Sequence, residues 1–374
     1  MQIACKREEL LKGIQTVQSV VGTKSTLPVL ANVLLEAKGE KMDMTATDLE
    51  VGIKCSVNVE VLEPGAITVP ARTLSEVVRE LPAQEVKMKV DENNRVEISS
   101  GQAVFNLLGL SREDYPVLPG LKGEDQFSMG VKLLSEMIKK TVFSVSQDET
   151  RYVLCGIYLQ VAKGKMTMVS TDGRRLSYIS KDVAVDKKKE ARVIIPTKAV
   201  NELNRILGQV LTREEAEEDR KVKISIEENQ IGFMIDDTIL ISRLIEGHFP
   251  NYEQVIPRTS AIHLKIGTEE LLQATRRVAL LTTGKSNSIR YSLKKNELII
   301  SANTEGLGQA RDVVGIDYAG EEMEIAYNPQ FIIDVLRNIG CEEVYLELTN
   351  SLNPCLIRPT SDEDYISIVM PMRI

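Results

Sequence analysis

Side chains suited to catalysis are few and widely spaced in this sequence. The 374 residues contain only His248 and His263 as imidazoles, and neither stands in a metal-binding spacing such as HExxH. The five cysteines form no CxxC pair, which indicates reduced thiols rather than disulfides or a zinc site. We therefore expect no bound metal and no catalytic centre built on histidine.

One segment, STDGRR at 170–175, could be mistaken for a phosphoryl-transfer site because an aspartate stands beside two arginines. No P-loop, glycine-rich dinucleotide motif or nucleophile elbow accompanies it. The Thr-Asp-Gly sequence is more typical of a tight turn. We predict a protein that has no enzymatic activity and needs no cofactor.

The overall composition is that of a globular protein. The hydrophobic fraction is 43% and the charged fraction 27%, and no apolar run approaches the roughly 18 residues needed to cross a bilayer. The first residues, MQIACKREELLKGIQ, meet charge before an apolar signal core can form. We expect a soluble cytoplasmic protein of two or three domains.

The chain contains three weak copies of one pattern, at spacings of roughly 125 to 140 residues. Each copy opens with an amphipathic helix that strands follow, and these helices are expected at 7–21, 131–145 and 269–283. The second half of each copy runs from a strand through a proline into another helix, at 67–81, 193–207 and 325–339. Pro70, Pro196 and Pro329 stand where a helix start tolerates a missing N–H. Each copy is therefore predicted to be an α+β unit, an antiparallel sheet with two helices on one side.

Proline, glycine and charged residues replace the periodic pattern at 118–125 and 255–262. We place domain boundaries there, which gives three domains at 1–121, 127–255 and 261–374. The acidic stretch at 212–221 is predicted to be a solvated loop or an extended helix end.

The net charge of −8, taken alone, argues against a nucleic-acid partner. In the predicted helices, however, basic residues outnumber acidic residues by 13 to 9, so the rest of the chain carries the negative excess. The segments counted are 6–21, 72–81, 131–144, 197–208, 268–281 and 329–338. Helices on one shared surface could attract phosphate while the other surfaces repel it. Ordinary solvated helix faces would carry the same charges, so charge alone leaves both interpretations open.

Six motifs follow one another along the whole chain, each occurring once. They are TLPVLANVLLEA (26–37), TATDLEVGI (45–53), VPARTL (69–74), ETRYVLCGIYL with VSTDGRRLS (149–177), GHFPNYEQVIP (247–257) and IVMPMRI (368–374). In order and spacing the sequence resembles the bacterial DNA polymerase III beta subunit family, the sliding clamps. The resemblance implies the DNA clamp fold, three similar domains per subunit, and a head-to-tail homodimer whose six domains close a ring with helices around the hole.

The resemblance also implies a function. Such a ring encircles duplex DNA, confers processivity on the replicative polymerase and is placed on DNA by a separate ATP-driven clamp loader. It contacts phosphates without reading base edges, because sequence-specific contacts would oppose sliding. Lys24 and Lys198 match family residues that contact DNA, and we add Arg72 and Arg205 because they lie on predicted helices.

A second site implied by the resemblance is a hydrophobic pocket near the junction of the second and third domains. It receives a short peptide from polymerases, the clamp loader and repair proteins, and methionines suit it because they adapt to several ligands. The matching positions are Arg151, Leu154, Thr171, Gly173, Arg174, Arg175, Leu176, Pro250, Val255, Leu352, Pro354, Ile368, Met370, Pro371, Met372 and Arg373. Arg174 stands where relatives often carry histidine, so the pocket rim stays cationic but loses a group that titrates near neutral pH.

The expected subunit seam departs from some relatives. Its apolar side chains are Phe105, Leu107, Leu280 and Leu281. The ionic partners seen in some relatives are largely missing. Gln102 and Val104 stand at positions that are basic there, and the uncharged Gly308, Gln309 and Ala310 stand where those relatives have an acidic stretch. We expect the dimer to depend mainly on apolar contact and on strand pairing across the seam.

Two other functions remain open from the residues alone. One is a scaffold that binds peptides but no DNA, which the acidic net charge would allow. The other is a single-strand binder, although 16 aromatic residues and no tryptophan leave few stacking platforms.

Overall fold

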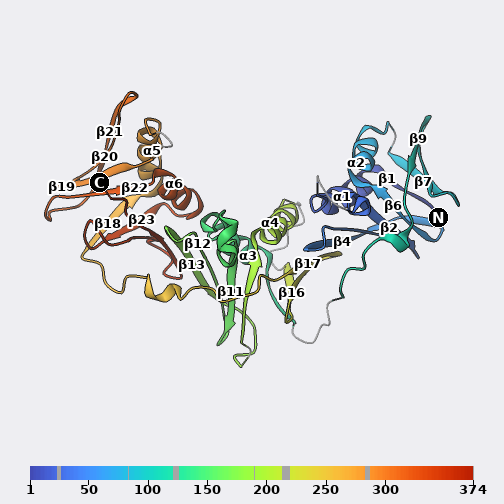
Figure 1. The fold of residues 1–374 in the computed structure, drawn as a ribbon, viewed down its shortest axis with the longest axis horizontal. Helices are drawn as coiled ribbons and strands as arrows, with labels where there is room; N and C mark the ends of the chain where they lie inside the picture. The colour runs from blue at the N-terminus through green and yellow to red at the C-terminus, as the bar shows by residue number, and fades with distance from the viewer. Residues whose placement is uncertain are drawn as a thin grey trace. The chain divides into compact units, whose positions relative to one another are not determined.

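The structure is a computed structural model that describes residues 1–22, 27–82, 84–120, 126–188, 190–212, 220–282 and 287–373. The chain forms two compact units (Figure 1). Unit 1 comprises Met1–Lys132 and Lys198–Leu244, and unit 2 comprises Leu133–Thr197 and Ile245–Ile374.

Unit 1 contains two antiparallel sheets. One has the strand order β5-β1-β7-β8-β9, and the other has the order β10-β15-β16-β17-β4-β3-β2-β6. Their strands are β1 (Gln2–Lys6), β2 (Asn32–Lys38), β3 (Lys41–Thr47), β4 (Val51–Asn58), β5 (Glu60–Glu63), β6 (Gly65–Pro70), β7 (Glu85–Val90), β8 (Arg95–Ser100), β9 (Ala103–Leu108), β10 (Gln126–Gly130), β15 (Lys221–Ile226), β16 (Gln230–Ile235) and β17 (Thr238–Arg243). The accompanying helices are α1 (Arg7–Gln18), α2 (Ala71–Glu80) and α4 (Thr197–Leu211), with the short turns η1 (Pro28–Ala31) and η2 (Arg112–Asp114).

Unit 2 also contains two antiparallel sheets. Their orders are β14-β11-β12-β13-β25-β24-β23-β18 and β21-β20-β19-β22. The strands are β11 (Gly156–Ala162), β12 (Lys165–Thr171), β13 (Arg175–Asp182), β14 (Ala191–Pro196), β18 (Ile262–Gly267), β19 (Ile289–Lys294), β20 (Glu297–Thr304), β21 (Gly308–Gly315), β22 (Met323–Tyr327), β23 (Glu343–Leu348), β24 (Cys355–Pro359) and β25 (Tyr365–Val369). The helical elements are α3 (Val131–Lys139), α5 (Thr268–Ala279), α6 (Pro329–Asn338), η3 (Val142–Ser144), η4 (Glu149–Leu154) and η5 (Tyr252–Gln254).

The three copies repeat one order of elements. The second copy runs β10, α3, β11 to β14, α4 and β15 to β17, and the third runs β18, α5, β19 to β22, α6 and β23 to β25. The first follows the same order with one added strand, β5. The predicted fold of antiparallel sheets with two helices per copy is confirmed.

The strands of the second copy divide between two sheets. Strands β10 and β15 to β17 join the first copy through the β17–β4 pair, and β11 to β14 join the third copy through the β13–β25 pair. Compact units therefore cut through the second copy. The predicted domain limits at 1–121, 127–255 and 261–374 follow the sequence repeat instead, and they stay a prediction.

Prolines and buried helix faces explain where the helices form. Pro329 opens α6, and the side chain of Asn328 accepts a hydrogen bond from the N–H of Gln330. In α1 the buried face repeats at helical spacing through Leu10, Ile14 and Val17.

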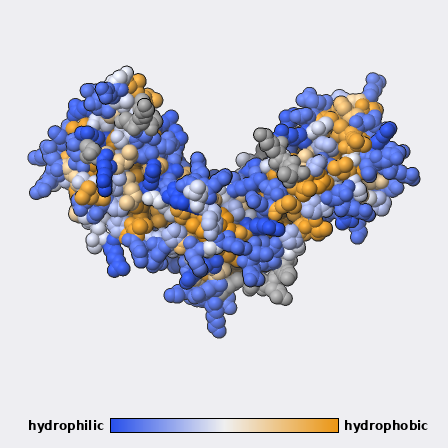
Figure 2. All heavy atoms as spheres, in the orientation of Figure 1, coloured by the Kyte–Doolittle hydropathy of each residue, from blue (hydrophilic) through white to orange (hydrophobic). Residues whose placement is uncertain are grey.

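Figure 2 shows hydrophilic residues over most of the visible face of each unit, with apolar residues between them.

Three helix predictions need correction at their ends. The helix expected at 269–283 ends at Ala279. The helix expected at 131–145 ends at Lys139 and the turn η3 follows, because the hydroxyl of Thr141 bonds back to the carbonyls of Met137 and Ile138. The helix expected at 7–21 ends at Gln18. Most of the acidic stretch at 212–221 lies outside the described residues.

Candidate functional site

A row of apolar side chains crosses the eight-stranded sheet of unit 2. Strand pairing places Tyr158 opposite Val169, Val169 opposite Tyr178, and Tyr178 opposite Ile366. Residues that pair across an antiparallel ladder share one face of the sheet. The row therefore spans four strands, from β11 to β25, on one face.

A second row lies one step further along the same strands. Thr171 pairs with Leu176, Leu176 with Ile368, and Ile368 with Leu356. Leu176 and Ile368 are almost fully buried. Since alternate residues of a strand point to the same side, this row shares a face with the first.

An exposed step follows the second row. The backbone N–H of Met370 donates to the carbonyl oxygen of Arg174 at 2.9 Å, which extends the pairing of β13 and β25 by one residue pair. Met370 is 40% exposed, and Arg174 is exposed as well. The apolar face thus ends at an accessible methionine and a cation.

The segment at 249–256, called here the covering segment, lies over these rows. Phe249, Tyr252 and Ile256 pack against the buried cluster. The ring of Phe249 stacks on Tyr158 with centroids 5.1 Å apart, and the ring of Tyr252 lies 5.9 Å from that of Tyr178. Burial raises the pKa of Tyr252 to about 12, so its phenol is neutral at physiological pH. The segment therefore adds an aromatic layer over the tyrosines of the first row.

The TDG sequence forms the tight turn between β12 and β13. The hydroxyl of Thr171 accepts from the N–H of Gly173 at 3.0 Å and donates to the carbonyl of Arg175 at 2.6 Å. One carboxylate oxygen of Asp172 accepts from the N–H groups of Arg174 and Arg175, at 2.9 and 3.0 Å. Gly173 has φ of 83°, a conformation that favours glycine. The interpretation of this segment as a turn is confirmed.

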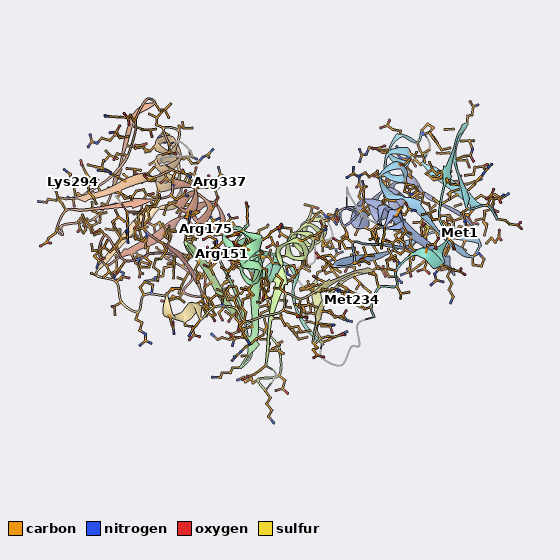
Figure 3. The ribbon with its side chains drawn as sticks, in the orientation of Figure 1. Met1, Arg151, Arg175, Met234, Lys294 and Arg337 are labelled. Carbon is orange, nitrogen blue, oxygen red and sulfur yellow. The ribbon has the colours of Figure 1, made fainter. Side chains whose placement is uncertain are left out.

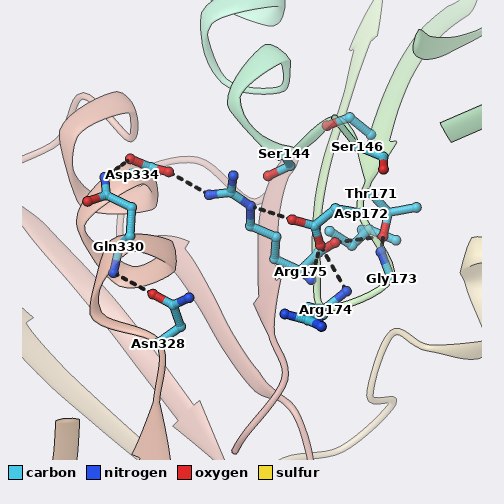
Figure 4. Close-up of polar contacts among 12 residues, drawn as sticks. Ser144, Ser146, Thr171, Asp172, Gly173, Arg174, Arg175, Asn328, Gln330 and Asp334 are labelled. Atoms are coloured by element: carbon cyan, nitrogen blue, oxygen red, sulfur yellow. Dashed lines mark hydrogen bonds and ion pairs between the residues drawn. The ribbon is translucent and has the colours of Figure 1, made fainter. Parts of the chain in front are cut away.

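Two arginines, labelled near one another in Figure 3, bind this turn. Nη1 of Arg151 donates to the backbone carbonyl of Asp172 at 2.9 Å, and its Nε pairs with Asp148 at 3.1 Å. Hydrogen bonds from the hydroxyl and N–H of Thr150, followed by those of Arg151, lower the pKa of Asp148. Arg175 pairs with Asp172 at 3.1 Å and with Asp334 of α6 at 2.6 Å (Figure 4).

The structure thus connects eight of the predicted peptide-site residues by strand pairing and hydrogen bonds. They are Arg151, Thr171, Gly173, Arg174, Arg175, Leu176, Ile368 and Met370.

The remaining predicted residues lie in segments that pack against this group, pair with its strands or adjoin it in the chain. Pro250 and Val255 belong to the covering segment, and Leu154 is a buried residue of η4. Leu352 and Pro354 lead into β24, whose Cys355 pairs with Val369. After β25 come Pro371, Met372 and Arg373, and the N–H of Met372 donates to Ala326 at 2.8 Å. Leu352 is 81% exposed, Val255 47% and Met372 39%, so these apolar side chains of the predicted pocket are accessible.

Sequence reasoning missed the residues that support this surface. The position of Tyr158 was detectable, because it alternates with the buried apolar residues Ile157 and Leu159 along β11. Asp334 of α6, which binds Arg175, had no such local signal in the sequence.

A separate cavity of about 140 Å³ lies in unit 1. Its lining comes from α1, β4, α4 and the turn between β16 and β17, and includes Lys12, Cys55, Gln209 and Asp237. Burial raises the pKa of Cys55 to about 12, with Asp43 and Asp237 adding to the shift, so this thiol is unreactive. None of the predicted site residues lines the cavity.

The predicted DNA-binding residues have different surroundings in unit 1. Arg72 is exposed on α2. Lys198, in the first turn of α4, forms an ion pair with Asp48 and stays 45% exposed. Lys24 lies outside the described residues.

Arg205 is engaged by the end of α1. Its Nη2 donates to the carbonyl of Thr16 at 2.6 Å and to the hydroxyl of Ser19 at 2.7 Å, and its Nε pairs with Glu202 at 3.0 Å. A cation at a helix C-terminus stabilises the unpaired carbonyls there. Arg205 therefore links α4 to α1.

The predicted seam residues lie on or beside strands that end a sheet in the part of the chain that the structure describes. β9 is the last strand of the five-stranded sheet, and β21 is the last strand of the four-stranded sheet. On β9, Phe105 is 37% exposed and Leu107 is partly buried. At the end of α5, Leu280 is 79% exposed and Leu281 is partly buried.

Two classes of site are not found in the described part of the chain. No group of three or more His, Cys, Asp or Glu side chains there is arranged to hold a metal ion. Among the same residues, no helix is both long enough and apolar enough to cross a membrane.

Comparison with known families covers nearly the whole chain. The N-terminal, central and C-terminal domains of the DNA polymerase III beta subunit match residues 1–119, 128–251 and 253–373, in that order. The chain belongs to the DNA polymerase III beta subunit family. Its function is that of a sliding clamp.

Relatives and solved structures of this family match over their full length. The beta sliding clamp of Chlamydia muridarum is 34% identical over 374 residues, which covers 100% of this chain and 99% of the relative. The DNA polymerase sliding clamp of Bacillus subtilis superposes with a TM-score of 0.94 at 29% identity, with 100% and 99% of the chains covered. A Pseudomonas aeruginosa sliding clamp bound to griselimycin gives a TM-score of 0.94 at 34% identity and full coverage of both chains.

Proposed function

We propose that two copies of this chain close head to tail into a ring around duplex DNA and hold the replicative polymerase on it. The observation that carries the proposal is the match of all three family domains, in order, across one chain. A clamp of this kind works beside the chromosome, in the cytoplasm.

Exposed strand edges support the head-to-tail contact. β9 and β21 each end a sheet, and an unpaired edge offers N–H and C=O groups to another strand. Val104 and Leu108 on β9 are 56% and 69% exposed, and Leu280 adds apolar surface at the end of α5. A contact between two different surfaces that closes after two copies gives a ring.

DNA contact in this ring is assigned to Lys24, Arg72, Lys198 and Arg205. Phosphate contact by long side chains is independent of sequence and weakens with salt. Arg72 and Lys198 keep exposed side chains for such contact. Arg205 is already bonded to α1, so we expect a smaller contribution from it.

The apolar surface of unit 2 is assigned to peptide segments of partner proteins. These partners are the polymerase subunit, the clamp loader, other polymerases and repair proteins. The exposed side chains of Met370, Leu352 and Val255 supply apolar contact, and Arg174 supplies a cation at the rim. A ring without its own energy source needs a separate ATP-driven loader to open it.

Retention on circular DNA tests the ring. The purified protein is loaded on a closed circle at moderate salt by a clamp loader with ATP, and its retention is measured before and after the circle is cut. Encirclement predicts retention on the circle and loss from the linear ends. Equal retention on both forms, falling steeply with salt, would mean ordinary electrostatic binding and would overturn the ring.

A further inference from the structure

Helix α6 contributes a carboxylate to the turn at 171–175. Oδ2 of Asp334 accepts a hydrogen bond from Nη1 of Arg175 at 2.6 Å. Its Oδ1 accepts from Nε2 of Gln330, one helical turn earlier, at 2.6 Å. Both carboxylate oxygens are therefore engaged, and Figure 4 shows Asp334 facing Arg175.

Arg175 is held from several sides. Its Nε pairs with Asp172 at 3.1 Å, and its side chain is only 11% exposed. The guanidinium also lies over the rings of Phe331 and Phe143, at 4.6 and 5.7 Å from their centroids. Turning toward a ligand would break two charge-assisted hydrogen bonds and leave two carboxylates without their cation. Arg175 thus stabilises the turn, and its charge is bound to the two carboxylates.

The turn at 171–175 in turn fixes the positions of Arg174 and Met370, the exposed step of the peptide surface. Asp172 holds the N–H groups of Arg174 and Arg175, and the carbonyl of Arg174 accepts from the N–H of Met370. A displacement of Asp172 therefore reaches both Arg174 and Met370 through hydrogen bonds of the backbone. These are the accessible cation and methionine at the end of the apolar rows.

Unit 1 contains the same kind of connection. Asp48 accepts from the N–H groups of Glu50 and Val51, at 3.0 and 2.8 Å, just as Asp172 does in its own turn. Its second oxygen pairs with Lys198 on α4. In both units an aspartate turn is therefore tied by an ion pair to the second helix of the following copy.

We propose that Asp334 is a positioning residue for the peptide site: by holding Arg175 it fixes the turn at 171–175, and with it Arg174 and Met370. The inference rests on the proposed peptide site and adds a residue outside it. Asp334 itself does not contact the peptide.

The test measures peptide affinity in matched variants of the full chain. Short peptides tiled across the organism's own replicative polymerase subunit are screened, and the tightest binder is labelled with fluorescein for anisotropy. Asp334→Asn keeps the shape but loses the charge, and it is expected to weaken binding about tenfold, the scale of one charge-assisted hydrogen bond. Asp334→Glu restores the carboxylate and is expected to bind close to wild type.

Asp362 provides the matched control. Its side chain is 19% exposed, against 20% for Asp334, and it pairs with Lys181 at 2.8 Å and with Lys140 at 3.3 Å. It lies at the other end of the β13–β25 ladder, where the N–H of Ser180 donates to Asp364. Asp362→Asn therefore loosens the same strand pair without reaching the turn, and we expect it to bind the peptide as wild type does.

Hydrogen exchange without peptide separates the two levels of the proposal. The amides of Arg174 and Arg175 are expected to exchange faster in Asp334→Asn and at the wild-type rate in Asp362→Asn. Wild-type affinity in Asp334→Asn, or equal weakening by both variants, would overturn the positioning role alone. A wild-type protein that binds none of the peptides would overturn the proposed peptide site, and the role of Asp334 with it, even if exchange at the turn responds.

Discussion

Side chains assigned to the same candidate site differ in exposure and in their partners. Arg174 and Arg175 are adjacent, yet the first is exposed and the second is bound to two carboxylates. Leu154 and Met370 both match the family pocket, but Leu154 is 7% exposed and Met370 is 40% exposed. A substitution at each of these positions therefore has a different cost for stability and for binding.

At this scale we predict that shortening Leu154 or Met370 to alanine abolishes peptide binding and leaves the ring intact. Met370→Ala removes exposed apolar surface, so its melting temperature is expected to match that of the wild type. Leu154→Ala empties a buried position and is expected to lower the free energy of unfolding by about 2 to 5 kcal/mol as well. Anisotropy with the labelled peptide, thermal melts and retention on circular DNA measure the three effects. Unchanged peptide affinity in both variants would remove the pocket assignment.

At the scale of elements, strand pairing both joins the copies and leaves edges. The β17–β4 and β13–β25 pairs each connect strands of two different copies into one sheet. By contrast β9 and β21 end their sheets with apolar side chains exposed. Such edges pair readily with another strand, which is the chemistry that the proposed seam requires.

Phe105→Lys on β9 is predicted to weaken self-association at least about tenfold, because burying an aromatic side chain contributes roughly 1.5 to 3 kcal/mol. The matched control is Leu62→Lys on β5, the opposite edge of the same sheet, where Leu62 is 55% exposed. Sedimentation velocity over a range of protein concentrations measures the dissociation of both variants. If Leu62→Lys dissociates as readily as Phe105→Lys, or if neither differs from wild type, β9 is not the seam.

At the scale of the whole molecule, the distribution of charge and the repeat agree with a clamp. The net charge is −8, although the predicted helices carry a positive excess. Basic residues gathered on helices of one surface would attract DNA there, while the acidic remainder repels it.

Such a protein has no need of its own chemistry, so we predict that the pure chain hydrolyses no nucleotide and needs no metal. A coupled ATPase assay with and without DNA, and with magnesium or a chelator, checks both statements. Turnover that copurifies with the chain through successive columns would contradict the non-enzymatic assignment. A chain that loses its self-association in a chelator, measured by sedimentation velocity, would contradict the second statement.

Local patterns in the sequence were enough to predict much of the fold. The helices after Pro70, Pro196 and Pro329, the tight turn at Thr171–Asp172–Gly173 and the threefold order of elements all depend on residues close in the chain. Periodicity, proline geometry and turn chemistry act over a few residues, so they can be read directly. The ends of α1, α3 and α5 were predicted too late; in α3, the bonds of Thr141 stop the helix before its apolar pattern ends.

The tertiary structure alone decided which partner each charged side chain has. Asp334 is 159 residues away from Arg175, and no local pattern marks the two as a pair. Likewise, only the packed structure shows that the strands of the second copy divide between two sheets and that Arg205 binds the end of α1. Local sequence determines which elements form, whereas contacts between distant residues depend on how those elements pack.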